Sequence, residues 1–228
     1  MNLRELAAPG INAVKEHWRP IVLIQACFVV FVILYFSTDV LKGLPATIDG
    51  FKAKVGEFPF TIATIWIVSL LVPEIAKFVT RQPLTKHTWK SIVTRLAYFA
   101  TIGFTLVFFY NWMNEVYGTS NDALNVARKV LTDQFVYSAL FSMPVAAITF
   151  LYEDSGFRFS EMVSRLKRGE FWKRYFPLMV TCLCYFGPVT VVMYSVPLAL
   201  QFPLAMCAQA AWGIIVVSVG SRDEGNPT

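Results

Sequence analysis

The stretch 176–219 reads FPLMVTCLCYFGPVTVVMYSVPLALQFPLAMCAQAAWGIIVVSV and contains no charged side chain. A helix of about twenty mostly apolar residues spans the hydrocarbon core of a bilayer. The stretch holds two such runs, 176–194 and 198–219, with little more than Val196 and Pro197 between them. So short a connection predicts an antiparallel hairpin of two membrane helices.

Four further apolar runs precede this hairpin, at 21–36, 58–72, 96–112 and 135–152, and the second could extend to Phe78. Hydrophobic residues make up 56% of the chain and charged residues 15%, against about 45–50% and about 25% in globular proteins. We therefore predict an all-α fold, a polytopic membrane protein with about six hydrophobic helices. This composition argues against a disordered tail, a solvated binding module and a water-soluble enzyme.

Basic residues are distributed unevenly between these runs. With six spans, fifteen of the twenty Lys and Arg residues fall on one face of the membrane. Lys and Arg stay on the cytoplasmic-type side of a membrane, so both termini are predicted there. The net charge of +5 is then explained by topology and anionic headgroups, and we expect membrane lipids, not nucleic acid, as partners.

The loop between the fourth and fifth runs contains an amphipathic pattern. Phe159, Met162, Val163 and Leu166 recur at helical spacing, with polar residues on the other face. Gly169 follows as a natural C-terminal stop. The pattern predicts a helix lying in the membrane interface.

Polar residues at membrane depth are costly and are therefore the candidates for function. Glu74 and Lys77 lie three residues apart near the end of the second run, where they can pair. Asp133 and Gln134 open the fourth run, and Gln201 lies in the sixth. The alternative for the Glu74–Lys77 pair and for Asp133 is a helix-end structural role, and the alternative for Gln201 is an interhelical hydrogen bond.

Two stripes of small residues predict close contacts between helices. The first is Ser138, Ser142 and Ala146, and the second is Ala97, Thr101 and Thr105. Seven prolines in or beside the runs predict bent helices, which can surround a cavity.

Motifs of enzymes and cofactor sites are missing from the chain. There is no phosphate-binding loop, dinucleotide motif, metal-binding helix or nucleophile elbow. The four cysteines lie within apolar runs and give no zinc-ligand spacing. We therefore expect no catalytic residue, no metal and no cofactor.

From residue 58 to residue 222, a series of features follows a familiar order: Pro59, Glu74, Gly103, Phe109-Tyr110, the segment KVLTDQ ending in Asp133 and Gln134, Val196-Pro197, Trp212 and Ser218. This order resembles the family of the peroxisomal membrane protein of twenty-two kilodaltons and its mitochondrial relatives Mpv-seventeen and Sym-one. Where that family has an arginine four residues after the proline, this chain has Gln201.

The resemblance implies three parts: an N-terminal extension with one transmembrane helix (1–57), a family-like membrane domain (58–222) and a polar tail (223–228). In this resemblance Pro59, Gly103, Tyr110, Pro197 and Trp212 are structural positions. It implies an organelle membrane, the inner mitochondrial first and the peroxisomal second, and weakly selective passage of small solutes.

Two hypotheses of function follow. In the first, the chain is channel-like, and Asp133, Gln134, Glu74 and Gln201 are the polar lining of a path for solutes or ions. In the second, it is a non-catalytic structural or accessory subunit of a larger mitochondrial membrane complex. Assembly as a homo-oligomer is compatible with both.

Overall fold

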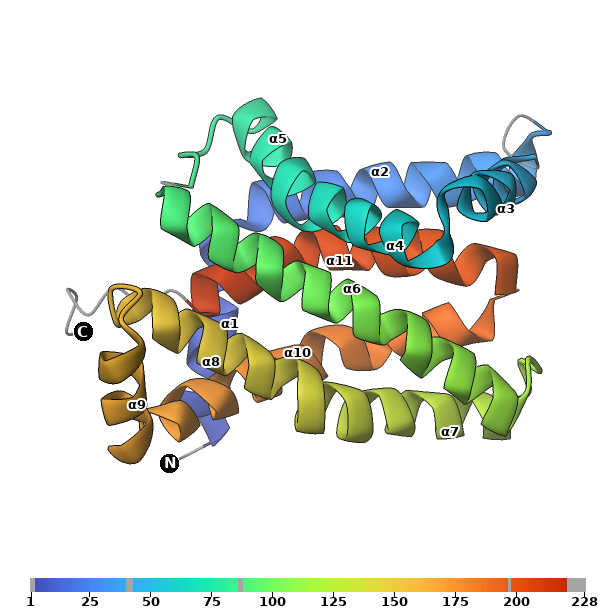
Figure 1. Ribbon diagram of the computed structural model, residues 1–228. Helices are drawn as coiled ribbons and strands as arrows, with labels where there is room; N and C mark the ends of the chain where they lie inside the picture. Colours follow the sequence, from blue (N-terminus) through green and yellow to red (C-terminus); the bar gives the residue numbers. More distant parts are fainter. Residues whose placement is uncertain (1–2, 40–42, 86–87, 197, 221–228) are drawn as a thin grey trace.

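The computed structural model describes residues 3–39, 43–85, 88–196 and 198–220, and in these ranges all regular secondary structure is helical (Figure 1). Six helical segments are long and apolar enough to cross a membrane: Trp18–Tyr35, Glu57–Val79, Trp89–Tyr117, Ala123–Asp154, Glu170–Ser195 and Leu200–Gly220. The prediction of an all-α fold with six apolar helices is confirmed, and the architecture is that of a multi-pass membrane protein.

Each span is built from one helix or from a chain of short helices. In chain order the elements are α1 (Leu3–Glu16), α2 (Trp18–Ser37), α3 (Leu44–Val55), α4 (Glu57–Trp66), η1 (Ile67–Leu71), α5 (Val72–Val79), α6 (Trp89–Tyr117), α7 (Ala123–Thr132), η2 (Asp133–Ser142), α8 (Met143–Asp154), α9 (Phe159–Lys167), α10 (Glu170–Ser195) and α11 (Leu198–Gly220). The segments η1 and η2 are π-helical. The second span is therefore α4–η1–α5, and the fourth is α7–η2–α8.

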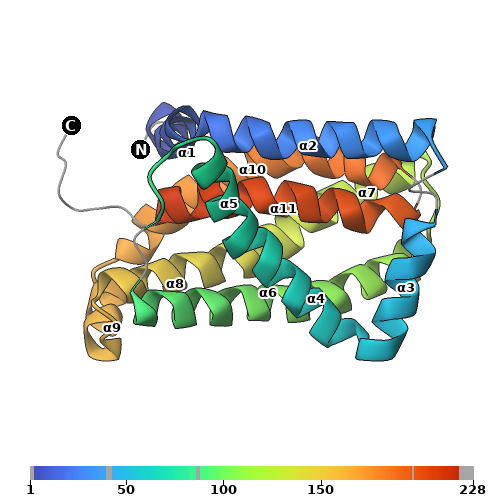
Figure 2. The same cartoon turned by 90° about the horizontal axis from the view of Figure 1, so that it is seen from above.

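The bundle has two distinct ends (Figure 1). One end, called here the terminal end, holds α1, α9 and the C-terminal turn of α11, and the other holds α3. Figure 2 shows α11 in the middle of the bundle, with α2 along one side and α4–η1–α5 crossing it diagonally. The C-terminal half of α11 is almost entirely buried, whereas α2 exposes much of its apolar surface.

The π-helical segments each stand directly before a proline-containing helix. Pro73 lies just after η1 and has no N–H to donate to the carbonyl of Ser69 four residues earlier. This carbonyl lies against Gly213 of α11, where an added Cβ would come within 2.6 Å of the Ser69 oxygen. Gly213 is thus required for the close approach of α11 to η1.

Gly213→Val is therefore expected to destabilise the bundle by about 1–3 kcal/mol or more, since inserted carbon atoms force the helices apart. The measurement is the melting temperature of the detergent-solubilised protein. Gly187→Val is the matched control, because a Cβ at Gly187 meets nothing within 4 Å. Equal melting temperatures for the two variants would contradict this packing.

The predicted amphipathic helix between the fourth and fifth spans is present as α9, and Gly169 follows it in the left-handed conformation, with φ of 78°. The stripe Ser138, Ser142 and Ala146 is buried, as predicted. In the second stripe only Thr105 contacts another helix, through the Tyr137 hydroxyl at 3.0 Å, whereas Ala97 and Thr101 of α6 are exposed. The Thr101 hydroxyl donates to the carbonyl of Ala97 in its own helix (2.9 Å), so it needs no partner helix.

The fourth span begins at a capped helix end. The Asp122 carboxylate accepts a hydrogen bond from the backbone N–H of Asn125 (3.0 Å) at the start of α7. The Ser120 hydroxyl also donates to this carboxylate (2.5 Å). The Ser120 hydrogen bond, followed by the Asn125 N–H, lowers the pKa of Asp122 below its ordinary value. A carboxylate at a helix N-terminus also interacts favourably with the helix dipole.

Candidate functional site

A cavity of about 550 Å³ lies at the α3 end of the bundle. It is bounded by α3, α4, α6, α10 and α11, and its volume is in the range of small-molecule sites. The charged and amide side chains of its lining, called here its mouth, are exposed or half-buried, whereas Leu106, Val107 and Met113 among the apolar ones are buried. The lining residues are Ile48, Asp49, Lys52, Glu57, Thr61, Leu106, Val107, Tyr110, Asn111, Met113, Asn114, Met193, Tyr194, Gln201, Phe202, Pro203, Ala205 and Met206.

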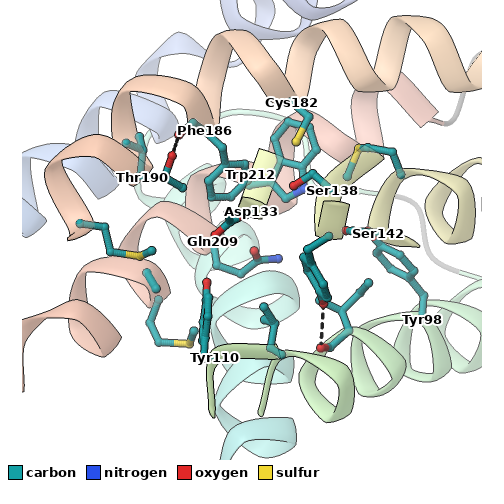
Figure 3. Close-up of a pocket in the computed structure, with 18 residues that line it drawn as sticks. Tyr98, Tyr110, Asp133, Ser138, Ser142, Cys182, Phe186, Thr190, Gln209 and Trp212 are labelled. Atoms are coloured by element: carbon teal, nitrogen blue, oxygen red, sulfur yellow. Dashed lines mark hydrogen bonds between the residues drawn. The ribbon is translucent and has the colours of Figure 1, made fainter. Parts of the chain in front are cut away.

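A second, smaller cavity of about 50 Å³ lies deeper in the bundle. Figure 3 shows side chains from α6, η2, α10 and α11 around it. Its polar lining includes Asp133, Ser138, Ser142, Thr190 and Gln209. The space accommodates a few water molecules, and its polar groups are of the kind that hold buried water.

A thin wall separates the two cavities. Five residues line both of them: Leu106, Tyr110, Met193, Ala205 and Met206. Four of these side chains are wholly apolar or thioether, so the wall offers little that could replace the hydration shell of a solute. The two cavities are thus adjacent and are separated by these mostly apolar side chains.

A hydrogen bond links Asp133, in the lining of the inner cavity, to Tyr194, in the lining of the large one. The Tyr194 hydroxyl donates to Asp133 Oδ2 at 2.6 Å. Tyr194 lines the large cavity, Asp133 lines the inner one, and Asp133 is only 6% exposed. A buried carboxylate needs such a donor, because removing an unpaired charge from water is costly.

Lys129 lies over the ring of the same tyrosine and is only 2% exposed. Its Nζ donates to Asn114 Oδ1 at 3.0 Å and lies 6.0 Å from the centre of the Tyr194 ring. Lys129 lines neither cavity. Tyr194 therefore has a buried positive group, Lys129, at the face of its ring and a buried carboxylate, Asp133, at its hydroxyl.

The terminal end of the bundle is closed by a group of ion pairs, called here the clamp. Arg95 Nε and Nη2 donate to the two oxygens of Glu153 at 3.1 and 3.0 Å, joining α6 to α8. Arg174 of α10 donates to Asp154 of α8 and to the carbonyl of Gly220 in α11. The clamp thus holds α6, α8, α10 and α11 together where they meet.

The residues predicted as polar lining fall in different places. Asp133 lines the inner cavity and Gln201 lines the large one. Gln134 is 3% exposed, and neither atom of its amide group has a hydrogen-bond partner, but it lines neither cavity. Glu74 lies near the terminal end, where it pairs with Lys77 at 3.2 Å as predicted and accepts from the Thr85 hydroxyl at 2.5 Å.

The positions that carry the family resemblance are mostly packing positions. Pro59 lies in the first turn of α4, and Gly103 faces α4, where an added Cβ would lie 3.3 Å from Ile62 Cα. Tyr110 belongs to the wall. The Trp212 ring stacks on Tyr185 with the ring centres 5.9 Å apart. Pro197 lies outside the described residues.

Several side chains of the site were not singled out from the sequence. Tyr194 and the pair Arg95–Glu153 each lie near a helix end in the sequence, where polar and aromatic residues are ordinary, and Lys129 entered the prediction only as the first residue of the KVLTDQ segment. Their burial becomes visible only when the helices are placed side by side. Spacing on an α-helix would not have connected Ser138 and Ser142 to Asp133, because offsets of five and nine residues lie on other faces of such a helix. The π-helical segment η2 brings all three to one cavity.

Within the described part of the chain no group of three or more His, Cys, Asp or Glu side chains is placed to hold a metal ion. Comparison with known protein families, with curated proteins and with solved structures finds no match for this chain.

Proposed function

We propose that this chain forms a narrow, weakly selective path for small solutes or ions across an organelle membrane, and that it is a divergent member of the Mpv-seventeen family. The observation that carries the proposal is the pair of cavities that share five lining residues. They extend from the α3 end to buried polar groups in the bundle. The family resemblance favours the inner mitochondrial membrane first and the peroxisomal membrane second.

Passage in this proposal is controlled at two barriers. The first is the apolar wall between the cavities, where a constriction blocks ions by remaining dry. The second is the clamp at the terminal end, whose ion pairs must separate or rearrange. No covalent step and no cofactor is involved.

The charges that line the path favour cations. Asp49, Glu57 and Asp133 are carboxylates, whereas Lys52 alone among the described lining residues carries a positive charge. Charged side chains along a narrow pore select ions of the opposite sign. The proposal therefore specifies a preference for small cationic or neutral solutes.

Asp133→Asn is expected to slow cation release from liposomes containing the purified protein by about thirtyfold. A unit charge about 8 Å from a permeating ion contributes about 2 kcal/mol at an effective dielectric constant of about 20, and the amide keeps the shape of the side chain. Single-channel conductance in planar bilayers provides a second measurement. Gln134→Leu is the matched control, since Gln134 is the next residue in η2 and lines neither cavity.

Unchanged release in Asp133→Asn would remove Asp133 from the path. No release from folded and inserted wild-type protein would overturn the proposal and favour an accessory subunit. The exposed apolar side chains of α2, including Val29, Val30 and Ile33, favour this second candidate, because they offer a surface for a neighbouring subunit. A native particle with fixed partners, far heavier than a few copies of the 25.8 kDa chain, would support it.

A further inference from the structure

The mouth of the large cavity carries an unbalanced negative charge. Lys52 Nζ lies 3.0 Å from Glu57 Oε1, so these two side chains neutralise each other. Asp49, one turn earlier on α3, has no hydrogen-bond or ion-pair partner within the ranges that the structure describes. A positively charged group entering the cavity therefore meets a free carboxylate.

Lys52 itself shows how this mouth holds an ammonium group. Its Nζ contacts the Glu57 carboxylate and lies 5.9 Å from the centre of the Phe202 ring. A carboxylate beside the face of an aromatic ring is a favourable environment for an organic cation. Because Phe202 and Glu57 both line the cavity, the chain's own ammonium occupies a place where a ligand's cationic group would be stabilised.

The deeper lining suits an apolar body of irregular shape. It contains two tyrosine rings, Tyr110 and Tyr194, and three thioethers, Met113, Met193 and Met206. Methionine side chains are polarisable and adapt to differently shaped ligands. The amides of Asn111, Asn114 and Gln201 add polar contacts without charge.

The buried charges behind the wall do not reverse this preference. Lys129 contributes one positive charge, and Asp133 contributes one negative charge. Both contact Tyr194, through the ring face and the hydroxyl respectively. Neither group lines the large cavity, and since Lys52 pairs with Glu57, the unbalanced charge among the described lining residues of this cavity is that of Asp49.

We propose that the large cavity is a binding site for lipophilic organic cations, with the cationic group at the mouth near Asp49 and Phe202 and the apolar body against the tyrosines and methionines. The inference extends the proposed path by naming a class of ligand. It is tested by binding to detergent-solubilised protein, so it does not depend on whether any solute crosses the membrane.

Tetraphenylphosphonium and tetraphenylborate are suitable probes, because they have nearly the same shape and opposite charges. Isothermal titration calorimetry in a neutral detergent, with the titration into detergent alone subtracted, measures each affinity. We expect saturable binding of the phosphonium at least about tenfold tighter than that of the borate. Asp49→Asn is expected to weaken phosphonium binding severalfold.

Lys52→Met is expected to act in the opposite direction. It removes the competing ammonium group and frees the Glu57 carboxylate, so phosphonium binding should tighten severalfold. Lys54→Met is the matched control, because Lys54 is exposed on the same helix and does not line the cavity. Equal binding of the two probes, no saturable binding of the phosphonium, or equal effects of the Lys52 and Lys54 variants would overturn the proposal.

Discussion

Glu153→Ala is expected to lower the free energy of unfolding by about 3–5 kcal/mol, because it leaves the buried guanidinium of Arg95 without its bidentate acceptor. Arg95 is 5% exposed, and two of its nitrogens donate to Glu153 at 3.1 and 3.0 Å. The Ser91 hydroxyl, which donates to the same carboxylate at 3.3 Å, loses its acceptor as well. Reversible unfolding of the detergent-solubilised protein, followed by circular dichroism, measures the change.

The double variant Arg95→Met and Glu153→Met separates the cost of removing one partner from the contribution of the pair. Replacing a buried ion pair by apolar side chains of similar size is often neutral, so the double variant should recover most of the lost stability. The pair Lys52–Glu57 provides a contrast, since the Glu57 side chain is 41% exposed. Glu57→Gln should cost no more than about 1 kcal/mol. If Glu153→Ala cost as little, the clamp would not hold the helices together.

The six spans could be predicted from the sequence because long apolar runs are the strongest local signal in a protein chain. The short helices at the N-terminal side were not predicted. In α1, Pro9 and Gly10 interrupt an amphipathic pattern. The structure explains the glycine, since an added Cβ at Gly10 would lie 2.3 Å from Thr181 Oγ1 in α10. That reason is a tertiary contact, which no local pattern contains.

The candidate site was only partly predictable, because a sequence does not show which helix ends meet. Asp133 could be identified because a carboxylate at membrane depth costs free energy. Its partner Tyr194, however, is sixty-one residues away in the sequence. Gln134 was expected beside Asp133 in the lining. Consecutive residues on a helix do not face the same way, so the two adjacent side chains enter different surroundings. Glu74 lies in the last helix of its span, at the terminal end, far along the bundle from Gln201 near the start of α11.

Opening the wall between the cavities should expose the thiol of Cys182, which lines the inner cavity and is 1% exposed. In a background with Cys27, Cys184 and Cys207 changed to Ser, Met206→Ala removes a thioether side chain from the wall. We expect Cys182 to react with a water-soluble thiol reagent about tenfold faster, equivalent to a barrier lower by about 1.4 kcal/mol. Ile214→Ala is the control, since this buried α11 residue lines neither cavity. The same acceleration in both variants would indicate general loosening of the bundle, and no acceleration with Met206→Ala would show that the wall does not separate the inner cavity from water.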